Sequence, residues 1–171
     1  LTNAKLAGPE FTSQSILKKF DVRVVGTTDD PTDSLKHHQT FAGSHHPTRM
    51  FPTYRPDKGM ITNDPDAWNI WTDKLAEASK QSIHSATDFL AALKERHDFF
   101  HDNGCRLTDH GLEGCPFIPC SDVQAEAIYK KLRNSDKPTA DEAEQWMPFK
   151  LQKVGRWNLE KGWPMLLHLG P

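Results

Sequence analysis

The stretch LTDHGLEG, residues 107–114, places a carboxylate and an imidazole side by side in Asp109 and His110. The Leu-Thr pair before them is typical of the end of a strand, and Gly111 allows a backbone that other residues adopt with difficulty. We therefore expect the strand to stop at this pair. Two interpretations remain open: the pair caps a turn, or it holds a polar ligand at the rim of a sheet or barrel. The choice depends on whether other strands of the chain end in the same way.

The composition is that of an ordinary soluble globular protein and predicts one domain over residues 1–171, with 26% charged and 36% hydrophobic residues. The formal net charge of −2 gives no reason to expect nucleic acid or an anionic membrane as a partner. No apolar run approaches the roughly 18–20 residues that span a bilayer, and the first residues do not resemble a signal peptide. A small-molecule ligand and a cytoplasmic location are the expectations.

The three cysteines, Cys105, Cys115 and Cys120, are too few for a disulfide framework and fit a reducing compartment. The segment CPFIPC could be imagined as a zinc knuckle. No second Cys/His pair stands at a recognisable spacing, so buried or loop thiols are the favoured interpretation.

Four segments have the character of strands, at about 22–28, 49–54, 104–109 and 164–169. The first, around Val22, Val24 and Val25, is apolar rather than alternating, as expected for a parallel strand covered on both faces. Pro52 weakens the second, because proline cannot donate to a strand ladder. Segments that predict helices separate most of these strands and are long enough for right-handed crossovers. The chain is therefore predicted to be α/β, with four neighbouring parallel strands in sequence order.

Four helices are predicted, over about 63–80, 85–104, 121–134 and 139–162. Capping residues mark their starts, including Asn63 or Asp64 before the first and Ser85 before the second. Thr139 with Glu142 forms a capping box for the fourth, in which Pro148 is expected to kink or split the helix. The connection at about 31–48 is expected to be an irregular solvated loop rather than a metal site, although it holds His37, His38, His45 and His46.

Polar side chains end every predicted strand: Thr27-Thr28-Asp29-Asp30, then Tyr54-Arg55-Pro56-Asp57, then Asp109-His110, and finally His168. In parallel α/β proteins, the carboxyl ends of all strands lie on one face, which carries the active site. Each end also has an ordinary explanation, such as a turn carboxylate, a local ion pair or a satisfied core histidine. The repetition in four strands favours a shared functional rim.

These segments resemble uronate (glucuronate) isomerases of the amidohydrolase superfamily. The resemblance extends from about residue 15 to 171 and is carried by KKFDVRVVGTTDDPTDSLKHH, PTYRPDK, FLAALKERHDFFHDNGCRLTDHGLE and GWPMLLHLG. It implies a distorted (β/α)₈ barrel, of which this central fragment supplies about strands two to five. It also implies interconversion of D-glucuronate with D-fructuronate, and of D-galacturonate with D-tagaturonate, in cytoplasmic sugar-acid catabolism.

Aldose–ketose isomerisation moves a proton from C2 to C1, which requires a base, a group that polarises the carbonyl and a clamp for the carboxylate. Arg55 suits the clamp, because a guanidinium matches a carboxylate bidentately. Asp29 and Asp57 suit substrate hydroxyls. Asp109 and His110 are the catalytic candidates, Asp109 by accepting hydrogen bonds and His110 by shuttling protons.

The resemblance adds a divalent metal, zinc by expectation, with His168 as a candidate ligand. The family's His-x-His pair of strand one and Asp of strand eight have no counterpart in this sequence, so the metal site is expected to be incomplete and the 171 residues inactive by themselves. Two alternatives remain: a metal-dependent hydrolase of the same superfamily, and a non-catalytic remnant or partner-binding module. The expected partners are a small sugar acid and further copies of the chain in a homo-oligomer.

Overall fold

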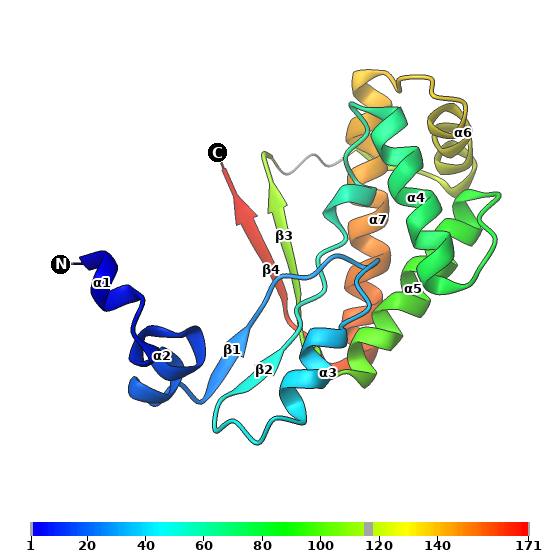
Figure 1. The fold of residues 1–171 in the computed structure, drawn as a ribbon. Coiled ribbons are helices and arrows are strands. Elements are labelled where there is room, and N and C mark those ends of the chain that lie inside the picture. Colours follow the sequence, from blue (N-terminus) through cyan, green and yellow to red (C-terminus); the bar gives the residue numbers. More distant parts are fainter. Residues whose placement is uncertain (1, 115–117, 171) are drawn as a thin grey trace.

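The computed structural model describes residues 2–114 and 118–170. The described part consists of helices and short parallel strands (Figure 1). In chain order the elements are α1 (Thr2–Leu6), η1 (Pro9–Phe11), α2 (Ser13–Lys19), β1 (Val24–Gly26), α3 (Lys36–Ala42), β2 (Arg49–Phe51), η2 (Asp57–Gly59), α4 (Pro65–Ser79), α5 (Ala86–Asp102), β3 (Thr108–Leu112), α6 (Asp122–Arg133), α7 (Ala140–Lys161) and β4 (Met165–Leu169). Among these residues, no helix has the length and apolar character needed to cross a bilayer.

The strands are parallel, which confirms the α/β class and the predicted strand direction, but they form two two-stranded sheets instead of one continuous sheet of four. β1 pairs with β2, and β3 pairs with β4. The two pairs meet at Tyr54, which forms isolated parallel bridges to Asp29 on one side and to Thr108 on the other. β2 stops at Phe51 because Pro52 has no N–H to continue the ladder.

The third strand begins later than predicted, at Thr108 instead of about residue 104. The interpretation of residues 107–114 therefore needs a correction. α5 ends at Asp102, and Gly104 with φ +93° turns the chain, so residues 105–107 are used to reach the sheet. β3 then includes Asp109, His110 and Gly111, which lie within the strand rather than after it. The prediction that Gly111 needs an unusual backbone was wrong, because its φ is not positive.

The histidine-rich connection contains a helix, α3, so the prediction of an irregular solvated loop was wrong for residues 36–42. The Asp33 carboxylate accepts the N–H of Leu35 at 2.6 Å and shapes the turn that precedes the helix. Leu35 is fully buried and anchors that turn in the core. As a result His38 is buried, whereas His37 and His45 are exposed as expected.

The four long helices begin close to their predicted starts, at caps formed by Asp64, Ser85, Ser121 and Thr139. The predicted split at Pro148 was wrong, since α7 runs through it without a break. Pro148 is buried, and residue 144, whose carbonyl loses its helical N–H partner, is exposed to water. Packing therefore holds the helix together where the local sequence would break it.

Two apolar clusters hold the helices to one another and to the sheet. The larger lies among α4, α5, α6 and α7, with Trp68, Phe89, Tyr129 and Trp146 at its centre. The smaller lies between the helices and the sheet and contains Leu35, Tyr54, Phe100, Cys105 and Trp163. Cys105 is a free buried thiol and Cys120 is free and half-buried, as expected, whereas Cys115 lies outside the described residues.

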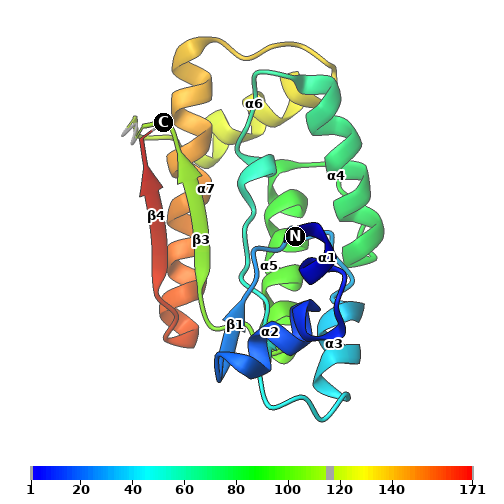
Figure 2. The same ribbon diagram turned by 60° about the vertical axis from the view of Figure 1, so that its left-hand side comes forward.

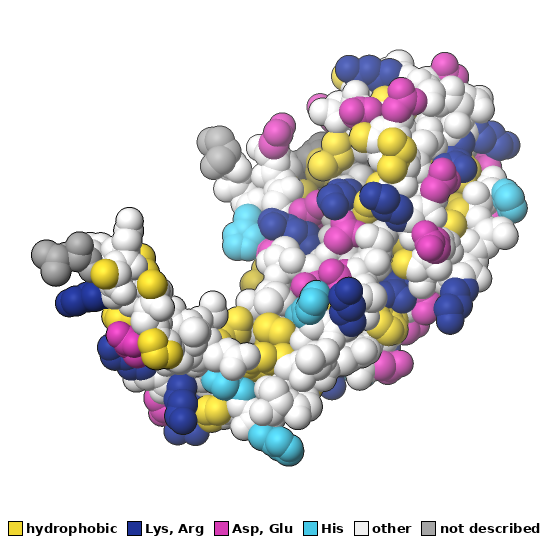
Figure 3. All heavy atoms as spheres, viewed as in Figure 1, with side chains coloured by type: hydrophobic (Ala, Val, Ile, Leu, Met, Phe, Trp, Pro, Cys, Tyr) yellow, Lys and Arg dark blue, Asp and Glu magenta, His cyan; other side chains and the backbone are white. Residues whose placement is uncertain are grey.

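The long helices cover one face of the sheet and leave the opposite face open (Figure 2). The molecule is hollowed between the N-terminal helices and the helical body, and acidic and basic side chains mix along the body's side of this hollow (Figure 3). The open face and edges expose the apolar side chains of Val24, Leu166, Leu167 and Leu169.

Buried polar side chains link the helix layer to β3. Asn158 of α7 donates to Thr108 Oγ1 at 2.7 Å, so its Oδ1 faces His97 Nε2 at 3.0 Å. His97 of α5 is 0% exposed and packs against Trp163, with ring centroids 4.3 Å apart. Burial lowers the pKa of His97 from 6.5 to about 4. The imidazole of His97 is therefore neutral in the folded chain at neutral pH.

We expect His97 to make folding stability fall in mild acid. Because the unfolded chain takes up this proton near pH 6.5 and the folded chain only near pH 4, stability is full above pH 6.5 and is lost as the pH falls toward 4. The loss attributable to His97 is about 3 kcal/mol. In urea denaturation at about pH 7 and pH 4.5, His97→Gln should lose clearly less stability than the unsubstituted chain. The exposed His37→Gln serves as control, and equal losses in all three proteins would contradict the assignment.

Candidate functional site

The bridges at Tyr54 decide which side chains face the helices and which face the open side of the sheet. Paired residues of neighbouring strands share a face, so Asp29, Tyr54 and Thr108 point the same way. That face is the helix side, because the Tyr54 hydroxyl donates to Leu93 O of α5 at 2.9 Å. The next residues along their strands alternate to the other face. Arg55 and Asp109 therefore face the open side.

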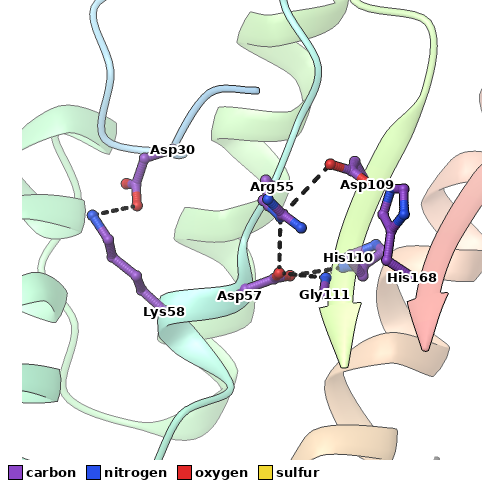
Figure 4. A network of polar contacts seen from close by, with 8 residues as sticks. All are labelled: Asp30, Arg55, Asp57, Lys58, Asp109, His110, Gly111 and His168. Atoms are coloured by element: carbon purple, nitrogen blue, oxygen red, sulfur yellow. Dashed lines mark hydrogen bonds and ion pairs between the residues drawn. The ribbon is translucent and has the colours of Figure 1, made fainter. Parts of the chain in front are cut away.

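Arg55 lies between two carboxylates at this end of the sheet (Figure 4). Its Nε is 3.0 Å from Asp57 Oδ2 and 3.7 Å from Asp109 Oδ2. The side chain of Arg55 is 34% exposed, and within the described residues neither Nη atom makes a hydrogen bond. The outer edge of the guanidinium therefore remains available for a further anion.

Gly111 makes room for this guanidinium. A Cβ at position 111 would lie 2.9 Å from Arg55 Nη2, closer than side chains tolerate. The glycine at the centre of LTDHGLEG is thus explained by the close approach of Arg55 and not by a turn. Its backbone also contributes, because the Gly111 N–H donates to Asp57 Oδ2 at 2.8 Å.

Asp57 connects η2 with β3 through both of its oxygens. Oδ1 is 3.1 Å from His110 Nδ1, and Oδ2 accepts from Gly111 and approaches Arg55. Burial raises the pKa of Asp57, but the hydrogen bonds from His110 and Gly111 and the nearby charges outweigh burial and lower this pKa below its usual value. Since a carboxylate only accepts, His110 carries its hydrogen on Nδ1. His110 is 0% exposed, and its Nε2 has no partner among the described residues.

His168 of β4 joins the cluster from the neighbouring strand. Its Nε2 is 2.6 Å from Asp109 Oδ1, and its side chain is 66% exposed. The structure thus brings together five of the six predicted site residues, namely Arg55, Asp57, Asp109, His110 and His168. Within residues 2–114 and 118–170, however, no three His, Cys, Asp or Glu side chains are grouped so that they could hold a metal ion.

Asp29, the sixth predicted residue, lies apart on the helix side. Its Oδ2 accepts from Thr27 Oγ1 at 2.6 Å and from the Thr53 N–H at 3.2 Å. Thr27 Oγ1 is in turn 2.7 Å from Nε2 of the buried His38. The sequence interpretation missed His38, because two adjacent histidines gave no sign that one of them turns inward. The role of Asp29 in substrate binding stays a prediction.

A second ion pair next to Arg55 was also missed. Lys58 Nζ is 3.2 Å from Asp30 Oδ2 (Figure 4). Trp71 of α4 fixes this carboxylate, since its indole N–H lies 2.9 and 3.0 Å from the two oxygens. The side chain of Lys58 is 65% exposed. The only sequence signal was the position of Lys58 directly after RPD.

Proteins of known family resemble this chain over nearly its whole length. A family model described as glucuronate isomerase matches residues 1–171. The chain belongs to this family. The uronate isomerases of Solibacter usitatus and Opitutus terrae are each 43% identical over 168 residues, which is 98% of this chain but 36% and 35% of those proteins. The chain therefore spans about a third of the length of the curated relatives it matches.

Two solved structures of the glucuronate isomerase family superpose on nearly the whole chain. The uronate isomerase of Thermotoga maritima gives a TM-score of 0.92 at 31% identity, and covers 99% of this chain and 37% of its own length. The glucuronate isomerase of Caulobacter crescentus gives 0.88 at 29% identity, covering 99% and 35%. The fold of this segment thus recurs within two crystal structures of the family.

We expect Gly111→Ala to destabilise the chain by about 0.5–1 kcal/mol, because the new Cβ meets Arg55 Nη2 and the flexible Arg55 side chain has to move away from its partly exposed ion pairs. Urea denaturation measures this loss. Gly114→Ala is a matched control, since none of the described residues lies within 4 Å of a Cβ at position 114. Equal stability of the two variants would show that Arg55 does not occupy the space beside Gly111.

Proposed function

We propose that residues 1–171 form one segment of a uronate isomerase, about strands two to five of a distorted (β/α)₈ barrel. The reaction is the interconversion of D-glucuronate with D-fructuronate, and of D-galacturonate with D-tagaturonate. Family membership supports this proposal, and so does the parallel sheet whose helices cover a single face. The relatives reported above are all named uronate or glucuronate isomerases, which favours isomerisation over hydrolysis.

The observation that carries the proposal is the position of Arg55 on the open face. Asp57 and Asp109 orient the guanidinium through Nε, which leaves both Nη groups for a ligand. A planar pair of donors suits the carboxylate of a sugar acid, whose two oxygens accept parallel hydrogen bonds. With one end of the substrate held in this way, its C1–C2 end is kept at a fixed distance from the clamp.

The isomerisation needs a group that moves a proton between C2 and C1. We assign this chemistry to Asp109 and His110. Asp109 shares the open face with Arg55, and its contact with the exposed His168 gives a proton a route between carboxylate and imidazole. His110 offers a free Nε2 but is completely buried, so it is the less accessible of the two. Asp57 and Asp29 are proposed to accept hydrogen bonds from substrate hydroxyls.

Uronate isomerases are metal-dependent, and we propose that a divalent metal, zinc by expectation, serves the reaction. The described residues do not form a metal site by themselves, because His168 and Asp109 are only two donors and the short contact between them turns them toward each other. His168 could supply one ligand if other parts of a longer protein supplied the rest. The proton and binding steps assigned here use the chain's own side chains.

The expected cellular setting follows from general properties of the chain. A cytoplasmic location is proposed because Cys105 and Cys120 are both free thiols. A small sugar acid is the proposed partner, and the net charge of −2 favours neither nucleic acid nor an anionic membrane. Homo-oligomer formation remains a prediction.

Arg55→Lys should lower kcat/KM for D-glucuronate about 100-fold in a protein spanning the full length of the relatives, because an ammonium replaces a planar fork with a point charge. Ketose formation with added zinc is the assay. Arg106→Lys is the matched control, since Arg106 is exposed and, in the part of the chain that the structure describes, donates to the carbonyls of His101 and Cys105 alone. An unimpaired Arg55→Lys enzyme would remove Arg55 from the carboxylate clamp.

We expect the 171-residue chain to show no turnover in the same assay, with or without zinc. It lacks a group of metal-ligating side chains within its described part, and misplacing even one catalytic group can reduce a rate about 100-fold. The full-length protein under identical conditions is the positive control. Measurable ketose formation by the short chain would mean that Asp109 and its neighbours form a complete site.

A further inference from the structure

Lys150 of α7 lies buried below the site, although its amine has no hydrogen-bond partner among the described residues. The residue is only 1% exposed. Its Nζ is 5.3 Å from the ring centroids of both Phe89 and Trp146, so its charged form makes cation–π contacts but no hydrogen bond within the described residues. A buried amine without a partner destabilises a protein, whereas a methionine of similar length would fill the same space without that penalty.

The Lys150 amine packs directly against the turn that carries Asp57. A Cβ on Gly59, the last residue of η2, would lie 3.0 Å from Lys150 Nζ and 2.9 Å from the Trp71 ring. Nothing larger than glycine therefore fits between the turn and the amine. Asp57 begins the same three-residue turn, so its carboxylate and the Lys150 contact lie at opposite ends of η2.

Two tryptophans hold this turn in place from the helix layer. The carbonyl of Gly59 accepts the indole N–H of Trp68 at 3.1 Å and that of Trp146 at 3.0 Å. Trp146 and Lys150 are four residues apart on α7 and therefore share one face of the helix. Together these contacts form a platform beneath η2, defined here as Trp68, Trp146 and Lys150.

The negative charge of Asp57 acts on the Lys150 amine. Burial lowers the pKa of Lys150 well below its usual value, and the negative charge of Asp57 raises it in opposition. Asp57 in turn holds His110 by Nδ1, Gly111 by its N–H and Arg55 by Nε. A displacement of η2 relative to the helices would therefore move the Asp57 carboxylate, and with it the groups that Asp57 holds on the open face.

We propose that Lys150 is a positioning residue, which holds the η2 turn so that Asp57 stays bonded to His110 and Arg55. Lys150 touches no reacting group and acts only through Asp57. Its effect on catalysis rests on the proposed isomerase activity, whereas its effect on His110 does not. The two can therefore be tested separately.

Histidine-selective ¹⁵N NMR of the 171-residue chain tests the structural part, because it distinguishes a ring protonated on Nδ1 from one protonated on Nε2. We expect His110 to be protonated on Nδ1 in the unsubstituted chain and to lose this single tautomer in Lys150→Met, while the unfolding midpoint in urea stays equal or rises. Gly59→Ala keeps the amine but displaces the turn, and should give the same change at His110. Lys153→Met, one turn along α7 and paired with the exposed Asp122, should leave His110 unchanged.

An unaltered His110 tautomer in Lys150→Met would overturn the proposal and make Lys150 a packing residue. Failure of Lys150→Met to fold would also overturn it, since the amine would then be needed for folding itself. In the full-length protein, Lys150→Met should lower kcat about 10- to 100-fold with little change in KM, and Lys153→Met should not. An altered His110 tautomer without any isomerase activity in the unsubstituted protein would reject the proposed function and leave the positioning role intact.

Discussion

Tyr54 is the residue on which the arrangement of the sheet and of the site depends. Tyr54 continues the β1–β2 pair by its bridge to Asp29 and joins it to β3 by its bridge to Thr108, and its hydroxyl fixes its side chain to α5. Because strand residues alternate in direction, burying Tyr54 on the helix side forces Arg55 to the opposite face. The same alternation places Asp109 beside it. One buried phenol therefore determines which polar groups a ligand on the open face could reach.

Local signals were sufficient to predict much of this fold from the sequence. Capping residues such as Ser85 and Thr139 marked the helix starts because a side chain that accepts an N–H acts within one turn. The alternation of apolar strands with helical segments fixed parallel strands and their order, because crossovers have one preferred hand. The clustering of Arg55, Asp57, Asp109, His110 and His168 followed from this topology and did not require knowledge of any contact.

The remaining features depended on contacts between distant residues, which no local pattern reveals. Gly111 resembled a turn residue, but what requires glycine there is Arg55, 56 residues earlier in the chain. His38 and the Asp29 carboxylate became neighbours only through the packing of α3 against β2. Pro148 predicted a break, yet packing kept α7 continuous. The start of β3 shifted because the chain needed residues 105–107 to cross from α5 to the sheet.

Buried polar atoms without a hydrogen-bond partner occur in several parts of the described chain, and two of them lie around η2. The cluster around Trp68 and Phe89 is apolar and closely stacked, and it can offset several unfavourable burials. Those burials include His110 Nε2 and Lys150 Nζ, the groups that lie against the two ends of η2. A fold selected only for stability would place apolar side chains at both positions. Their retention around Asp57 is the physical reason to regard η2, and not only the strand ends, as part of the site.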